Sequence, residues 1–195
     1  MITTMGNTEK IIAIGGSAGS LPVVLYILQN LPVGYTTPII IILHRLKNTP
    51  TEMDKIVSIT RGDLNLREPD DKEPISPGYI YIAPANYHLL VESDKTFGLD
   101  YSEPVQYSRP SIDVSFESIA TAYGTNATAI LLSGANNDGT EGIAIILEKG
   151  GTGIVQAPAT SEYAIMPAAA IKKNPSAFIY TPSQILQYLE NLNLF

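Results

Sequence analysis

Cysteine is absent from all 195 residues of the sequence. This absence excludes disulfide bonds, thiolate nucleophiles and cysteine-based zinc sites, and it suits a reducing compartment. Long apolar runs are also missing, because aliphatic stretches such as IIIIL at 39–43 are far too short to span a bilayer. The opening MITTMGNTEK lacks the basic segment and apolar stretch of a signal peptide. We therefore expect a cytoplasmic protein without membrane insertion.

Positive charge is scarce. The chain has 12 Lys and Arg against 19 Asp and Glu, a net charge of −7, and no basic cluster longer than Lys172-Lys173. A nucleic acid partner is therefore excluded, since a phosphate backbone requires a basic surface. With 45% apolar and 16% charged residues, the chain should fold as a single domain over 10–195, after a tail at 1–9.

Short β-rich runs alternate with stretches of helical period along most of the chain. This alternation predicts an α/β fold, a doubly wound and mostly parallel sheet flanked by helices. Strands are expected at 11–14, 38–43, 127–132, 153–156 and 177–180. Helices are expected at 21–30, from a capping box at 49–52 to about residue 60, in the RPSIDVSFESIATAYG segment, around 143–147, at 166–173 and from residue 181 onward.

The middle of the chain breaks this alternation. Three strand-like runs, GYIYIAP, YHLLVES and KTFGLDYS, follow one another with turn residues between them and no helices. This pattern predicts an antiparallel hairpin excursion from the parallel sheet.

Three polar residues, Ser17, His44 and Asp138, each follow a predicted parallel strand. Open α/β sheets bind ligands outside the carboxyl ends of their strands. The GGSAG segment fits the G-x-S-x-G turn that projects a nucleophilic serine. His44 could take the serine proton and Asp138 could orient the imidazole, so we expect a chain of contacts of about 2.6 to 3.2 Å.

Each of these residues also has a structural interpretation. Ser17 or Ser20 could cap the first helix or bind an anion at its amino terminus. His44 could be a hydrogen-bonded structural residue, and the spacing from Asp138 to Glu141 is that of a helix capping box. A dinucleotide site is disfavoured, because Ser17 occupies the second glycine position of G-x-G-x-x-G, and the Lys-Ser/Thr ending of a P-loop is missing.

Chain order separates the hydrolase types. The only histidines are His44 and His88, so none follows Asp138. The nucleophile, acid, histidine order of α/β-hydrolases would require an acid before His88, where none ends a convincing parallel strand. The strand ends instead supply the order serine, histidine, aspartate.

That order and the local sequences resemble the chemotaxis protein-glutamate methylesterase family, the catalytic domain of CheB. The matching segments are IAIGGSAGS, IILHRL, PGYIYIAPANYHLLV, RPSIDVSFESIA, ILLSGANNDGTEG and VQAPATSEYAIMPAAAI, which together cover nearly the whole chain. The resemblance implies hydrolysis of γ-glutamyl methyl esters on chemoreceptors to glutamate and methanol, with glutamine deamidation in some members. It assigns Ser17, His44 and Asp138 as the catalytic triad. We expect no cofactor and no metal ion.

The chemistry of a serine esterase adds further candidate site residues. Backbone N–H groups of Ala18 and Ala135, in loops after predicted strands, are candidates for the oxyanion hole. Arg109, in the RPS segment that lies near the cleft in this family, is a candidate substrate contact, with a surface ion pair as the alternative. The chain departs from the family by Ala18, where threonine is frequent, and by ANND, where MGND is frequent.

Family members in chemotaxis commonly carry an amino-terminal receiver domain, whereas this sequence starts ten residues before its first predicted strand. We expect a stand-alone domain whose activity is controlled by a separate regulatory protein, by expression level, or not at all. The expected partner is a methylated chemoreceptor or a similar helical signalling protein. The alternative is a catalytically inactive methylesterase-like module that binds a signalling partner or a small anion.

Overall fold

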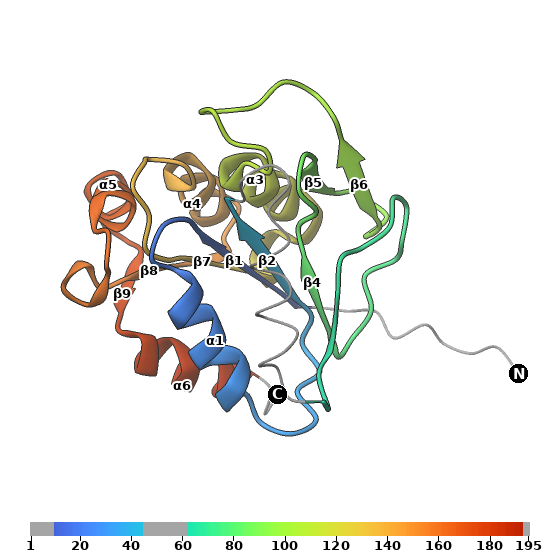
Figure 1. The fold of residues 1–195 in the computed structure, drawn as a ribbon, viewed down its shortest axis with the longest axis horizontal. Helices are drawn as coiled ribbons and strands as arrows, with labels where there is room; N and C mark the ends of the chain where they lie inside the picture. The colour runs from blue at the N-terminus through green and yellow to red at the C-terminus, as the bar shows by residue number, and fades with distance from the viewer. Residues whose placement is uncertain (1–9, 45–61, 193–195) are drawn as a thin grey trace, which may run out of the picture.

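The computed structural model describes residues 10–44 and 62–192, and it is an α/β sandwich built on one large sheet (Figure 1). The sheet has seven strands in the order β3-β4-β2-β1-β7-β8-β9, and every neighbouring pair is parallel. The strands are β1 (Ile11–Gly16), β2 (Ile39–Leu43), β3 (Asn65–Arg67), β4 (Tyr79–Ile82), β7 (Ala127–Leu131), β8 (Thr152–Gln156) and β9 (Phe178–Tyr180). The predicted mostly parallel, helix-flanked sheet is confirmed.

Helices cover both faces of the sheet (Figure 1). On one face lie α1 (Leu21–Asn30) and α6 (Pro182–Leu192), and on the other lie α3 (Ile112–Tyr123), α4 (Thr140–Glu148) and α5 (Ile165–Lys173). Two short 3₁₀ helices, η1 (Gly124–Asn126) and η2 (Pro158–Thr160), complete the order. In the described part of the chain, no helix combines the length and the apolar character needed to cross a membrane.

The double covering explains why the central strands β1 and β2 are apolar throughout. Successive side chains of a strand point to opposite faces. In β1, Ile12 and Ile14 pack in the cluster with α1 and α6, whereas Ile11 and Ala13 pack in the cluster with α3 and α4. Because both faces of β1 and β2 are buried, the polar residues Ser17 and His44 come only after these strands end.

The middle segment is only partly the predicted excursion. The antiparallel hairpin consists of β5 (His88–Val91) and β6 (Phe97–Asp100). The GYIYIAP run does not belong to it, because its strand β4 pairs in parallel with β2 and β3 in the main sheet. Ile80, Tyr81 and Ile82 are all buried, as expected for a strand covered on both faces. The helix predicted after the capping box at 49–52 and the predicted tail at 1–9 lie outside the described residues.

Candidate active site

Strand order brings the three predicted residues to one edge of the sheet. β1 lies between β2 and β7, so Ser17, His44 and Asp138 follow the carboxyl ends of three adjacent strands. The His44 N–H donates to the Gly16 carbonyl at 3.1 Å, which places His44 beside the Ser17 turn. Residues far apart in the chain are therefore neighbours at this edge.

Ser17 sits in a tight turn between β1 and α1. Gly19 has φ +74°, a left-handed conformation that favours glycine, and a Cβ on Gly16 would come within 2.6 Å of the Ser20 Cβ. The Ser17 N–H donates to the Ser133 carbonyl at 2.9 Å, which ties the turn to the end of β7. The backbone of Ser17 is thus held firmly while its side chain faces the cleft.

The helix-cap interpretation of these serines is not observed. Ser20 occupies the N-cap position of α1, but its hydroxyl makes no cap hydrogen bond and donates instead to the Ser17 carbonyl at 2.6 Å. Among the described residues, none forms a hydrogen bond with the Ser17 hydroxyl. The hydroxyl is therefore available to a bound molecule.

The Asp138 carboxylate is buried and saturated with donors. It lies at the amino terminus of α3, where the positive end of the helix dipole favours an anion. Its donors are His44 Nε2 (2.7 Å), the N–H of Ile112 (2.8 Å), Asp113 (2.9 Å) and Gly139 (3.0 Å), and Ser111 Oγ (3.0 Å). The capping box predicted from Asp138 does not form, because the N-cap of α4 is Gly139, which has no side chain to cap the helix.

These contacts keep Asp138 ionised. Burial acts to raise the pKa of its carboxyl, but the hydrogen bonds from His44 and from the first-turn amides of α3 outweigh burial and lower the pKa below 3.8. An ionised carboxylate only accepts hydrogen bonds, so Nε2 of His44 carries the hydrogen in their contact. The neutral imidazole then has its basic lone pair on Nδ1.

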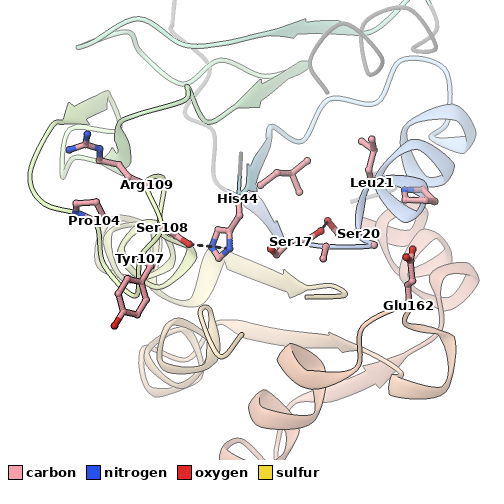
Figure 2. Close-up of a pocket in the computed structure, with 13 residues that line it drawn as sticks. Ser17, Ser20, Leu21, His44, Pro104, Tyr107, Ser108, Arg109 and Glu162 are labelled. Carbon is pink, nitrogen blue, oxygen red and sulfur yellow. Dashed lines mark hydrogen bonds between the residues drawn. The ribbon is translucent and has the colours of Figure 1, made fainter. Parts of the chain in front are cut away.

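Nδ1 faces the hydroxyl of Ser108, with a distance of 3.3 Å between the two atoms (Figure 2). Of the predicted chain of contacts, the structure therefore forms the part between His44 and Asp138. Within the described residues, Ser17 makes no hydrogen bond to His44, although both side chains line one cleft. Sequence reasoning did not find Ser108.

The cleft has a volume of about 720 Å³ and opens over the carboxyl ends of β1 and β2. Its lining includes Ser17, Ala18, His44, Ser108, Arg109 and Glu162. His44 and Glu162 stand on opposite sides of it, with Ser17 between them (Figure 2). A space of this size accommodates an extended side chain together with part of the protein that carries it.

The two predicted oxyanion residues are both exposed at this edge of the sheet. In the part of the chain that the structure describes, neither the Ala18 nor the Ala135 N–H donates to another backbone group outside regular structure. Ala18 lines the cleft, whereas Ala135 is not among the described lining residues. Both amides remain candidates as donors to a bound oxygen.

Arg109 lines the cleft, but its guanidinium is already engaged. Nη1 donates to the carbonyls of Tyr101 at 3.0 Å and Ser102 at 2.6 Å, and the group lies 4.0 Å from the centre of the Tyr101 ring. The guanidinium points away from Ser17 and His44 (Figure 2). The observed contacts therefore hold the 101–109 segment together, and the predicted substrate contact remains a prediction.

Asp113 is a further buried carboxyl that sequence reasoning missed. It accepts hydrogen bonds from the Gly142 N–H at 2.7 Å and from Gln106 Nε2 at 2.9 Å. Burial raises the pKa of Asp113 to about 6; the Gly142 hydrogen bond opposes this, and the neighbouring Asp138 charge reinforces it. Its only sequence signal is an acidic residue in the first turn of a helix, which is ordinary for any helix.

The second histidine, His88, is structural. Its Nδ1 accepts from the Ser111 N–H at 3.1 Å, and its Nε2 lies 3.1 Å from the Glu103 carbonyl, so both ring nitrogens are occupied by the backbone. Over residues 10–44 and 62–192, no group of three or more His, Asp or Glu side chains is arranged to hold a metal ion.

Fold and site together define an open α/β protein with a buried carboxylate–imidazole pair next to a serine turn, at the carboxyl edge of a parallel sheet. Comparison with known proteins narrows this class. The model of the CheB methylesterase family matches residues 12–189. The chain belongs to the CheB methylesterase family.

Individual relatives agree with this membership. A putative protein-glutamate methylesterase/protein-glutamine glutaminase of Leptospira interrogans is 38% identical over 187 residues, which are 96% of each chain. A protein-glutamate methylesterase/protein-glutamine glutaminase 2 of Shewanella sp. is 36% identical, and the match covers 95% of this chain and 54% of that longer protein. The crystal structure of the Thermotoga maritima CheB methylesterase catalytic domain superposes with a TM-score of 0.85, at 29% identity, over 94% of this chain and 98% of that one.

Proposed function

We propose that this protein is a serine carboxylesterase that hydrolyses γ-glutamyl methyl esters on chemoreceptor-like helical proteins, releasing glutamate and methanol. The observation that carries the proposal is the 2.7 Å contact between His44 Nε2 and the ionised Asp138, beside a Ser17 hydroxyl that forms no hydrogen bond with the residues the structure describes. The names of the Leptospira and Shewanella relatives support the substrate class.

Ser17 is the nucleophile in this proposal, and His44 is its base. Because Nε2 is held by Asp138, the proton of the Ser17 hydroxyl passes to Nδ1 as Oγ attacks the ester carbonyl. The imidazolium that forms is stabilised by the Asp138 carboxylate. Nδ1–H then donates its proton to the departing methoxy oxygen, so that methanol leaves and an acyl-enzyme remains.

The tetrahedral oxyanion needs donors that are already in place before attack. The backbone N–H groups of Ala18 and Ala135 are assigned this role. Since they belong to the backbone, the family threonine and methionine at these positions can be replaced without loss of the donors. A contribution from a threonine hydroxyl at position 18 is lost.

Water completes the cycle by the same route. His44 takes a proton from water through Nδ1, the hydroxide attacks the acyl carbon, and the proton returns to Ser17 Oγ as the glutamate carboxylate leaves. Attack on a glutamine side chain forms the same acyl-enzyme with ammonia as the leaving group. We therefore include glutamine deamidation as a second reaction of the site, in line with the names of both relatives.

Methanol release from methylated receptor fragments tests the proposal. Ser17→Ala should lower turnover by several powers of ten, since loss of any triad member disables the unit. The melting temperature should be nearly unchanged, because among the described residues that hydroxyl makes no hydrogen bond. Ser183→Ala, which removes an exposed hydroxyl from α6, serves as the matched control and should retain full activity.

A fluorophosphonate probe provides a second readout. Wild type and Ser183→Ala should be labelled at Ser17, and Ser17→Ala should not be labelled. Full activity in a folded Ser17→Ala protein would overturn the assignment of the nucleophile. Absence of both methanol release and labelling in the wild type would favour the non-catalytic module.

A further inference from the structure

A strained turn stands at the mouth of the cleft. Val105 and Ser108 exchange two backbone hydrogen bonds, of 3.1 Å from the Val105 N–H and 2.9 Å from the Ser108 N–H. The two residues between them, Gln106 and Tyr107, have φ of +48° and +64°. Neither is glycine, so both occupy a left-handed conformation that is unfavourable for a residue with a Cβ. Such strain persists only where surrounding contacts hold it.

The strain is not explained by burial of the turn itself. The Tyr107 side chain is fully exposed to solvent. Gln106, in contrast, is anchored, because its Nε2 donates to Asp113 Oδ2 at 2.9 Å. Asp113 is held in turn by the Gly142 N–H at the start of α4.

This anchor belongs to the same scaffold that holds the triad aspartate. Asp113 lies in the first turn of α3, and its own N–H donates to Asp138. Through Gln106 and Asp113, the turn is thereby connected to the amino terminus of α3, which binds Asp138.

The residue of this turn that contacts His44 is Ser108. Its Oγ lies 3.3 Å from Nδ1 of His44 (Figure 2). Nδ1 carries the lone pair in the neutral ring, so the Ser108 hydroxyl is the donor. The ring is therefore held at both nitrogens, at Nε2 by Asp138 and at Nδ1 by Ser108.

We propose that Ser108 is a positioning residue for the general base: the anchored 105–108 turn uses its hydroxyl to hold Nδ1 of His44 toward the cleft until Ser17 transfers its proton. This role rests on the proposed esterase function. Ser108 itself exchanges no proton with the substrate. Because Nδ1 has only one lone pair, the Ser108 hydroxyl must stop donating to it before the Ser17 proton arrives; the Ser108 oxygen can then face the protonated ring.

The test compares Ser108→Ala with Ser102→Ala. Both variants remove one serine hydroxyl from the same segment, but the Ser102 hydroxyl binds Asp100 and makes no contact with His44. Among described charged groups, Asp138 contacts the imidazole, Asp113 adjoins Asp138, and Arg109 and Glu162 line the cleft; none is changed by either substitution.

Ser108→Ala should lower kcat about threefold to tenfold with little change in KM, because the ring is then held at one edge only. The acid limb of the pH–rate profile should move to higher pH, since a hydrogen bond to the neutral imidazole is lost. Ser108→Thr keeps the hydroxyl and should restore most of both properties. Gln106→Ala should also lower kcat, because the turn then loses its hydrogen bond to Asp113.

An NMR titration of the imidazole signals separates this proposal from the esterase proposal. The chain has two histidines, so the His44 signal is assigned by its loss in His44→Gln. Its midpoint should rise in Ser108→Ala and stay in place in Ser102→Ala and Ser108→Thr. This measurement needs no substrate, so the midpoint shift would support the contact even if the wild type released no methanol.

Two results would overturn the positioning role. One is an unchanged midpoint and pH profile in a folded Ser108→Ala protein. The other is a rise in its plateau rate, which would mean that Ser108 obstructs Nδ1 instead of holding it.

Discussion

His44 Nε2 and Asp138 Oδ2 lie 2.7 Å apart, although 94 positions separate the two residues in the chain. The same Asp138 oxygen accepts the N–H of Ile112 at the start of α3. The carboxylate that orients the imidazole is therefore also part of a helix terminus. Changes at Asp138 or at its donors should affect activity and stability together.

Asp138→Asn should reduce kcat by about four powers of ten, the magnitude seen when a triad aspartate becomes an amide elsewhere. An amide nitrogen in place of Oδ2 would face the Ile112 N–H and Nε2–H, two donors. The imidazole should respond by moving its hydrogen to Nδ1, which removes the lone pair that Ser17 needs. Methanol release and the His44 NMR signal would show the loss and the tautomer change.

The same substitution should destabilise the fold by about 1 to 3 kcal/mol, because buried donors lose their acceptor. Thermal melts would measure this. Asp94→Asn, in the exposed turn between β5 and β6, is the control and should leave activity intact. Wild-type turnover in a folded Asp138→Asn protein would remove Asp138 from the mechanism.

Ser17→Ala and His44→Ala should not have additive effects. If Oγ and Nδ1 act as one unit, either substitution alone should remove nearly all triad catalysis, by several powers of ten, and the double variant should lose little more. Methanol release by all four proteins measures the coupling. Losses that multiply across the two sites would mean that Ser17 and His44 act separately.

Ser111→Ala should destabilise the protein by about 1 to 2 kcal/mol. The Ser111 hydroxyl lies 3.5 Å from the Val114 N–H as the N-cap of α3, and it also donates to Asp138 at 3.0 Å. Because Asp138 would lose one of its donors, turnover should also fall, by about tenfold. Urea denaturation and methanol release test the two effects, with Ser102→Ala as the control. A change in stability without a change in turnover would show that this donor does not matter to the site.

Asp113 should make stability fall as pH rises through weakly acidic values. Its folded pKa of about 6 is above the ordinary 3.8, so the native state binds more protons than the unfolded state between about pH 4 and 6. The unfolding free energy therefore decreases with rising pH in that window. Asp138 has the opposite effect on stability, and it does so at lower pH. Because its pKa is lowered, the stability it contributes is lost only as pH falls below 3.8.

Asp113→Asn should flatten this slope. The amide oxygen of asparagine can still accept the Gly142 N–H, and the Gln106 amide can turn its oxygen to face the new NH₂ group. Urea denaturation between about pH 4 and 7 measures the slope. Asp94→Asn should not change this slope. The pKa of Asp94 is lowered below 3.8, mainly by the hydrogen bond from the Thr96 side chain, so Asp94 does not titrate in the measured pH range. An equal slope in wild type and Asp113→Asn would assign it to another group.

The fold was largely predictable because its signals are local. Apolar runs such as 39–43, and the helical repeat of Ile112, Phe116 and Ile119, depend on burial that residue type and spacing reveal directly. The GYIYIAP run was misplaced because a short apolar strand looks the same in a hairpin and in a parallel sheet. Its pairing with β2 depends on residues about 40 positions away.

By itself, the sequence determined that Ser17, His44 and Asp138 end buried strands, and through its motifs it indicated the family. Only the tertiary structure decided that β1 lies between β2 and β7, that Asp138 binds the terminus of α3, and that Ser108 meets Nδ1. The physical reason is the separation along the chain between the residues that interact. Strand and helix preferences arise from neighbouring residues, whereas the hydrogen bonds that orient an imidazole join segments that meet only when the whole core packs.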